Sequence, residues 1–165
     1  MSIFQIIQAD PDLVLLIQEA VFNTLKVYAC SDIETKPLFH KEHDSSFEVS
    51  IIGMLRLSSQ KGDDLLAIGF SERAFMTLYQ NMFNEEPEVI SSDNKDLAGE
   101  LINIIFQTID PELRKKGYFC EVSLPEVLTG TDLEKWSRFL VKESLVLPFA
   151  TANGDLFFEI PNFKK

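Results

Sequence analysis

Four short polar side chains are spaced within residues 92–116 as one helical stripe. At about 100° per residue, Asp96, Glu100, Asn103 and Gln107 fall within roughly 60° of one another. No Lys or Arg lies between them to form the usual i,i+4 surface ion pairs. A carboxylate and a carboxamide one turn apart can together hold a water molecule and a cation of a partner. The stripe is therefore either a site that does chemistry on a bound partner or the solvated face of an ordinary surface helix.

The other positions of this segment are apolar and must be buried. Apolar residues from Leu97 to Leu113 spread over more than half of the helical circumference. We expect a helix from about Ser92 to Lys116, stopped by Gly117, that packs on a sheet and leaves a thin polar ridge exposed.

Alternating apolar residues and turn signals predict the sheet that positions this helix. The expected strands are 47–58, 65–70, 118–124 (ending at Pro125), 145–151 and 156–160. Asn153-Gly154 predicts a hairpin with a type I′ turn, since both central residues of that turn need positive φ.

Two further helices follow from capping signals and apolar spacing. Asp10 and Pro11 open a helix over 11–29, and Ser71 caps one that runs to about Asn84. Residues 31–46 are expected to form a loop, or a loop around a poor strand, and residues 131–142 a short helix or an irregular insertion.

Composition limits the class of protein. The 165 residues carry 15 Lys and Arg against 26 Asp and Glu, a net charge of −11, with 45% hydrophobic residues. This predicts one folded domain over 1–165 and argues against nucleic acid or an anionic membrane as partner. No signal peptide or apolar run of membrane-spanning length is visible, so a soluble cytoplasmic protein is expected. Cys30 and Cys120 are expected to be buried thiols, with a single disulfide as the alternative.

The string Asp96-x-x-x-Glu100-x-x-Asn103, followed after 21 residues by Pro125 in Ser-Leu-Pro-Glu-Val-Leu-Thr-Gly, resembles the signature of the chemotaxis phosphatases CheC, CheX and FliY. The order of strand, strand, helix and motif helix also agrees with that family over nearly the whole chain. The resemblance implies an α+β, CheC-like fold in which helices pack on an antiparallel sheet and the long motif-bearing helix is exposed on one face.

Members with two motifs carry the second one on the first helix. Here that helix has Glu19, but Phe22 stands in place of the amide and Asn23 comes one residue late. The chain therefore resembles CheX more than CheC, which implies a homodimer formed through a shared sheet, with the C-terminal hairpin as a suitable edge. One departure is Gln107, where a small residue is common.

The resemblance implies an enzyme that hydrolyses the aspartyl phosphate of a CheY-like response regulator. Glu100 would pair with the receiver's active-site lysine, and Asn103 would orient the attacking water. Asp96, Gln107 and Pro125 would have supporting or docking roles. The chain would need no cofactor or metal of its own, because Mg²⁺ belongs to the receiver.

Three alternatives stay open. The fold could serve as a non-catalytic partner-binding module, as in the middle domain of FliM. It could also be a relative with a lost or changed substrate. His40 and His43 could hold zinc if further ligands came from elsewhere in the chain.

Overall fold

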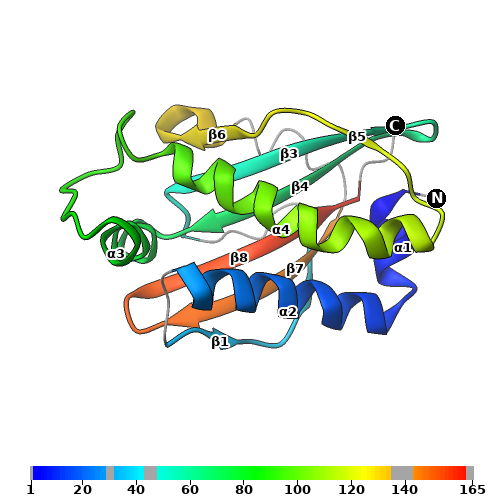
Figure 1. Cartoon of the computed structure of the whole chain (residues 1–165), viewed down its shortest axis with the longest axis horizontal. Coiled ribbons are helices and arrows are strands. Elements are labelled where there is room, and N and C mark those ends of the chain that lie inside the picture. The colour runs from blue at the N-terminus through cyan, green and yellow to red at the C-terminus, as the bar shows by residue number, and fades with distance from the viewer. Residues whose placement is uncertain (1, 29–31, 43–47, 135–142, 163–165) are drawn as a thin grey trace.

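The structure is a computed structural model that describes residues 2–28, 32–42, 48–134 and 143–162 (Figure 1). Its centre is an eight-stranded sheet with the order β1-β7-β8-β4-β3-β5, in which β2 also pairs with β7 and β6 with β3. Every pairing is antiparallel. The strands are β1 Glu34–Thr35, β2 Phe39–Glu42, β3 Ile51–Ser59, β4 Gly62–Phe70, β5 Glu121–Val122, β6 Glu126–Thr129, β7 Glu143–Thr151 and β8 Gly154–Pro161.

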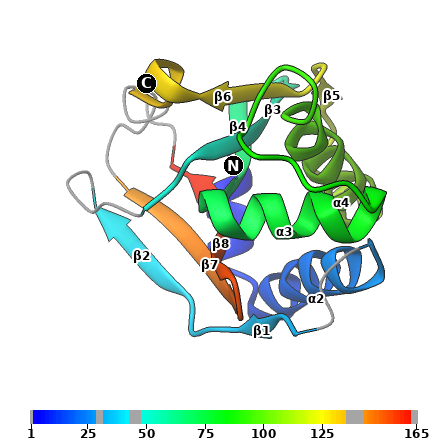
Figure 2. The ribbon, with the colours of Figure 1, turned by 90° about the vertical axis from the view of Figure 1, so that its left-hand side faces the viewer.

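Helices cover one face of this sheet. They are α1 Ile3–Gln8, α2 Pro11–Tyr28, α3 Glu72–Phe83 and α4 Asp96–Lys115. Figure 1 shows α2 and α4 side by side and antiparallel across the strands, with α3 at one end, and Figure 2 shows α2 and α4 on the same side of the sheet. The predicted α+β architecture is confirmed.

Alternation along the central strands separates two apolar clusters, because successive side chains point to opposite faces. On β3, Leu55 and Leu57 face the helices and join the main core, whereas Ile52 and Met54 join a smaller cluster on the other face. The main core therefore lies between the sheet and the helices.

Local capping explains where the helices begin. The side chain of Asp10 accepts a hydrogen bond from Leu13 N (3.2 Å) at the start of α2, and Ser71 Oγ accepts one from Ala74 N (3.3 Å) in α3, as predicted. The start of α4 differs from the prediction: it begins at Asp96, not Ser92. The buried Asn94 explains this, because its side chain bonds Ser91 N (2.9 Å) and Val89 O (2.8 Å) and holds 91–95 in a turn.

The predicted C-terminal hairpin is present, but its turn type was wrong. Thr151 pairs with Gly154, so Ala152 and Asn153 occupy the centre. Neither has positive φ, whereas Gly154 has φ +131°. The Thr151 hydroxyl donates to Gly154 O (2.7 Å) and accepts from Asn153 N (3.2 Å), which stabilises a turn with glycine at its last position.

The β3–β4 hairpin uses the same turn chemistry. Ser59 Oγ donates to Gly62 O (3.2 Å) and accepts from Lys61 N (3.2 Å), and Gly62 has φ +119°.

The strand expected over 118–124 was also wrong in extent. Only Glu121–Val122 pairs with β3 there, and pairing resumes in β6 after Pro125. Tyr118 instead turns into the core, where its hydroxyl donates to Asp64 (2.8 Å), and Pro125 has no N–H for a ladder.

The C-terminal hairpin is not an edge of the sheet, contrary to the expectation for dimerisation. β7 pairs with β1 and β2 on its outer side, and β8 pairs with β4. The reason is that the loop predicted over 31–46 contains two short strands that cover β7.

Helix α1 was not predicted from the sequence. Its N-cap is Ser2, whose hydroxyl caps the helix.

The segment predicted as a short helix or an irregular insertion, 131–142, is described only in part. A 3₁₀ turn spans Gly130–Asp132, and 135–142 lie outside the described residues. None of the helices in the described part of the chain combines the length and apolar character needed to cross a membrane.

Candidate active site on the α4 ridge

Close backbone packing fixes α4 on the sheet. Gly53 of β3 lies directly under the helix, and a Cβ at this position would overlap Ala98 O. Glycine is therefore the residue that lets the first half of α4 approach the strand this closely.

A second close contact fixes the same turn of α4 from the β5–β6 side. A Cβ at Gly99 would lie 2.9 Å from Pro125 Cβ and 3.4 Å from Val127 Cγ2. Gly99 directly precedes Glu100, so the connection between β5 and β6 packs against the backbone that carries this carboxylate.

The predicted polar ridge is confirmed as a feature of the surface. Asp96, Glu100 and Gln107 are exposed, and Asn103 is half-buried, while the apolar residues of α4 from Leu97 to Leu113, except the half-buried Ile104, face the core. Within 2–28, 32–42, 48–134 and 143–162, none of the four ridge side chains makes a hydrogen bond or an ion pair. Their donors and acceptors are thus available to a partner.

The ridge suits positioning chemistry. Side chains three residues apart on a helix are neighbours, with Cβ atoms about 5–6 Å apart, so Glu100 and Asn103 can act on one bound group. The amide of Asn103 both donates and accepts hydrogen bonds, and the Glu100 carboxylate can receive a cation. The single histidine in the described residues, His40, lies on β2 and not on the helical layer.

A groove borders the ridge on the α2 side. It has a volume of about 490 Å³ and lies between α2 and α4. Its lining consists of Leu16, Glu19, Ala20, Asn23, Thr24 and Val27 from α2 and Ile104, Thr108 and Glu112 from α4.

The structure places the residues of the incomplete motif on the first helix in two different surroundings. Glu19 and Asn23 are both exposed on its wall, while Phe22 is half-buried against the main core and lies under Lys26, whose Nζ is 5.4 Å from the ring centroid. At the amide's expected position, α2 therefore packs an aromatic ring against the core.

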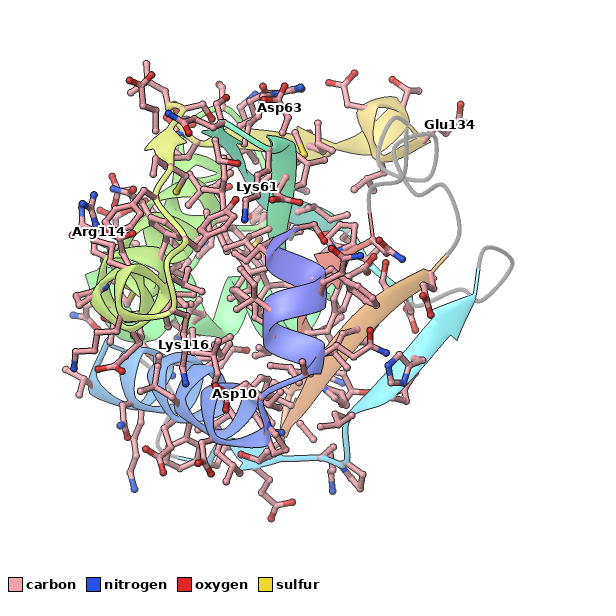
Figure 3. The ribbon with its side chains drawn as sticks, turned by 90° about the vertical axis from the view of Figure 1, so that its right-hand side faces the viewer. Asp10, Lys61, Asp63, Arg114, Lys116 and Glu134 are labelled. Atoms are coloured by element: carbon pink, nitrogen blue, oxygen red, sulfur yellow. The ribbon has the colours of Figure 1, made fainter. Side chains whose placement is uncertain are left out.

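Another hollow lies at the other end of α4 and does not include the ridge. It measures about 750 Å³ and is lined by Lys61, Arg114 and Lys116 together with Tyr118 and Cys120, among others. Figure 3 shows Lys116 pointing toward Asp10, 2.7 Å away. Arg114 donates to Asp110 (3.0 Å), so two of these three cations are already paired within the chain.

Buried titratable groups beside this hollow have a structural role. Asp64 accepts hydrogen bonds from Tyr118 Oη (2.8 Å) and Ile3 N (3.2 Å), which tie the segment after α4 and the start of α1 to β4. Burial raises the pKa of Asp64 despite these bonds and raises that of Tyr118. Burial also raises the pKa of the half-buried Cys120 thiol to about 11, so this thiol is protonated at neutral pH.

Two predictions from the sequence involve residues that lie outside the described part of the chain. His40 is exposed, with Nε2 3.3 Å from Gln8 Nε2, but His43 is not described, so the zinc alternative stays untested. Cys30 is likewise not described, and Cys120 is a free thiol. No cluster of three or more His, Cys, Asp or Glu side chains suited to a metal ion occurs among the described residues.

The structure thus brings Glu100, Asn103, Asp96 and Gln107 together on one ridge and places Pro125 beside it through Gly99. Neither the α2–α4 groove nor the exposure of Leu124 was predicted from the amino-acid sequence. The groove could not be read from α4 alone, because its other wall belongs to α2.

Known structures show the same fold. The chemotaxis protein CheX of Vibrio vulnificus shares 20% identity at a TM-score of 0.76, covering 91% of this chain and 98% of that one. A CheC-like superfamily protein of Shewanella shares 22% identity at 0.76, covering 92% and 97%. CheX from Borrelia burgdorferi, solved in complex with CheY, beryllofluoride and Mg²⁺, shares 15% identity at 0.72, covering 92% and 98%.

Sequence comparison gives the family. No curated protein sequence matches the chain significantly. A family model described as chemotaxis phosphatase CheX matches residues 51–150, which span the strands under α4, the whole ridge and Pro125. The chain therefore belongs to the chemotaxis phosphatase CheX family.

Proposed function

We propose that this chain hydrolyses the aspartyl phosphate of a CheY-like response regulator in the cytoplasm, using Glu100 and Asn103. The observation that carries the proposal is the α4 ridge, where these two side chains are presented without partners in the described structure. Membership of a phosphatase family and the CheX–CheY complex from Borrelia burgdorferi support it.

The reaction needs positioning more than new reactive groups. Water attacks the phosphorus in line as the bond to the receiver's aspartate oxygen breaks. The products are a free carboxylate on the receiver and inorganic phosphate, which keeps the oxygen and both protons of the water as dihydrogen phosphate. Asn103 would orient this water through its amide, and Glu100 would bind the receiver's active-site lysine and set the register of the two proteins.

Mg²⁺ would come with the receiver. The described part of this chain offers no cluster of metal-ligating side chains, and the Borrelia complex contains Mg²⁺ together with CheY. Asp96 in the first turn of α4 and Gln107 about three turns further on would contact the receiver around the reacting group.

The test is single-turnover loss of phosphate from phosphorylated CheY-like receivers with Mg²⁺. We expect wild-type protein to accelerate hydrolysis and Asn103→Ala to lower the rate constant on the order of 100-fold, because misplacement of the water removes the positioning effect. Glu100→Ala should chiefly raise KM. Gln60→Ala, which removes an exposed amide in the β3–β4 turn, is the matched control and should behave as wild type.

Two results would overturn the proposal. One is that no receiver loses phosphate faster with wild type than alone. The other is that Asn103→Ala, shown to be folded by circular dichroism, keeps full activity. Tight binding of a beryllofluoride-loaded receiver without acceleration would favour the non-catalytic binding module.

We also propose a homodimer that joins two sheets through β2. This strand pairs with β7 on one side, and in the described structure no other strand pairs with it, while Leu38 and Phe39 beside this edge are 40% and 36% exposed. Sedimentation equilibrium of wild type and Leu38→Asp tests it: a dimer that becomes monomeric supports the arrangement, and a wild-type monomer contradicts it.

A further inference from the structure

The polar ridge of α4 lies between two flanks of the helix, one beside the β5–β6 connection and the other beside α2. In an ideal helix Gly99 lies roughly 60° to one side of Asp96, and Ile104 lies roughly 80° to the other side. Gly99 contacts Pro125, and Ile104 lines the groove that also contains Val27. The β5–β6 connection and the C-terminal end of α2 therefore border the ridge from opposite directions.

Leu124 is presented on the first flank by an anchored backbone. On one side of it, Ser123 N donates to Arg56 O (3.0 Å) and Ser123 Oγ accepts from Arg56 N (3.1 Å). On its other side, Pro125 packs against Gly99. The Leu124 side chain is nonetheless 87% exposed, the highest value among the exposed large apolar residues of the described chain.

Val27 and Ile104 give the second flank an apolar surface. Val27 is 78% exposed and Ile104 half-buried, and both line the α2–α4 groove. The charged residues among the described lining of this groove are Glu19 and Glu112, and Glu112 is already paired with Lys115 (2.9 Å). A partner that covers the ridge would therefore meet apolar contacts on both sides and the Glu19 carboxylate along the groove.

We propose that Leu124 and the Val27–Ile104 flank are the apolar contacts through which the phosphorylated receiver binds, with Leu124 as the main anchor. This inference rests on the proposed function, because the receiver is the partner that must reach Glu100 and Asn103. The receiver surface next to its phosphoaspartate then carries apolar side chains for both flanks and Lys or Arg opposite Glu19. An exposed leucine on a fixed backbone suits this role, since little conformational freedom is lost when a partner covers it.

The experiment compares Leu124→Ser and Val27→Ser with Leu15→Ser as matched control. Leu15 is 56% exposed on α2 but does not line the groove. Two sets of quantities are measured with the CheY-like receiver that wild type binds most tightly in its beryllofluoride-loaded form: the Kd for the receiver loaded with Mg²⁺ and beryllofluoride, and the KM and kcat for phosphate loss.

We expect Leu124→Ser to raise KM and Kd about 10-fold, as follows from burial of one leucine side chain, with kcat unchanged. Val27→Ser should raise both by a smaller factor, and Leu15→Ser should raise neither. An unchanged Kd for Leu124→Ser, a loss confined to kcat, or a change in oligomeric state without a change in Kd would overturn the inference.

The experiment distinguishes failure of this inference from failure of the proposed phosphatase function. If wild type hydrolyses nothing but binds the beryllofluoride-loaded receiver, the phosphatase proposal fails while the Kd comparison still tests Leu124. If wild type is active and the three serine variants share its KM and Kd, the phosphatase proposal stands and the anchor inference fails.

Discussion

Pro125 packs against Gly99 so closely that a Cβ on Gly99 would lie 2.9 Å from Pro125 Cβ. The two residues belong to segments that are distant in the sequence, one inside α4 and the other in the connection between β5 and β6. Their contact joins the segment that carries the exposed Leu124 to the turn of α4 that carries Glu100, because each of these residues is adjacent in the chain to one of the contacting residues. Changes at this contact should therefore affect the site as well as the fold.

Gly99→Ala is expected to lower both stability and activity. Alanine gains about 1 kcal/mol of helix propensity over glycine, but overpacking against Pro125 costs about 1–3 kcal/mol, and the displaced helix moves Glu100. Urea unfolding and kcat/KM for phosphate loss measure the two effects.

The double variant Gly99→Ala/Pro125→Gly is the control for this contact. Glycine at position 125 removes the Pro125 Cβ that would lie 2.9 Å from the new methyl group, so the two changes should be non-additive by about 1 kcal/mol or more. Strict additivity would show that the close approach does not limit position 99.

Gly53→Ala should be more damaging, because the obstructing atom is the backbone oxygen of Ala98 and not a side chain. We expect a loss of about 3 kcal/mol in the free energy of unfolding, at the upper end for overpacking. Gly117→Ala is the comparison: it meets no atom within 4 Å and pays for its positive φ alone, about 1–2 kcal/mol. Equal losses in urea unfolding would contradict the packing argument.

Gln107→Ala is expected to increase kcat/KM several-fold without a change in stability. Gln107 is exposed on the ridge one turn beyond Asn103, and we expect its bulk to limit how closely a receiver can approach. An exposed helix position without partners should change stability by less than about 0.5 kcal/mol. The kinetic assay with wild type and Gln60→Ala in parallel measures the effect, and a lower kcat/KM would show that Gln107 instead binds the receiver.

Asp64 should make stability fall as the pH rises. Burial raises its folded-state pKa above the usual value of 3.8, so the folded state holds a proton that the unfolded state has released. Stability is therefore highest below pH 3.8 for this group and decreases as the pH rises through its folded pKa. Asp64→Asn should flatten this part of the stability profile, measured by urea unfolding across pH, and an unchanged slope would exclude Asp64 as its source.

Tyr118→Phe tests the same buried contact from the other side. Loss of the hydroxyl leaves the buried carboxylate with one fewer donor, so we expect about 1.5–3 kcal/mol of destabilisation at neutral pH. In the Asp64→Asn background the same change should cost less, because the acceptor carries no charge. An equal cost in both backgrounds would assign the effect to packing of the ring.

Local signals in the amino-acid sequence predicted the ridge and the helices α2, α3 and α4. Apolar spacing along α4 and the capping residues Asp10 and Ser71 act over a few neighbouring positions, so they could be recognised without any knowledge of tertiary contacts. The motif of Asp96, Glu100 and Asn103 could be recognised in the same way, because all three residues lie within one helix. The turn type at Thr151–Gly154 was missed although it is local, because the hydroxyl of Thr151 outweighs the preference expected from Asn153-Gly154.

Tertiary structure alone decided what surrounds the ridge. The contact of Pro125 with Gly99, the groove between α2 and α4 and the position of the C-terminal hairpin inside the sheet all join segments that are distant in the chain. Periodicity shows which face of an element is buried but does not name the partner that covers it. The neighbours of Glu100 and Asn103, and with them the expected contacts of the receiver, therefore follow from packing.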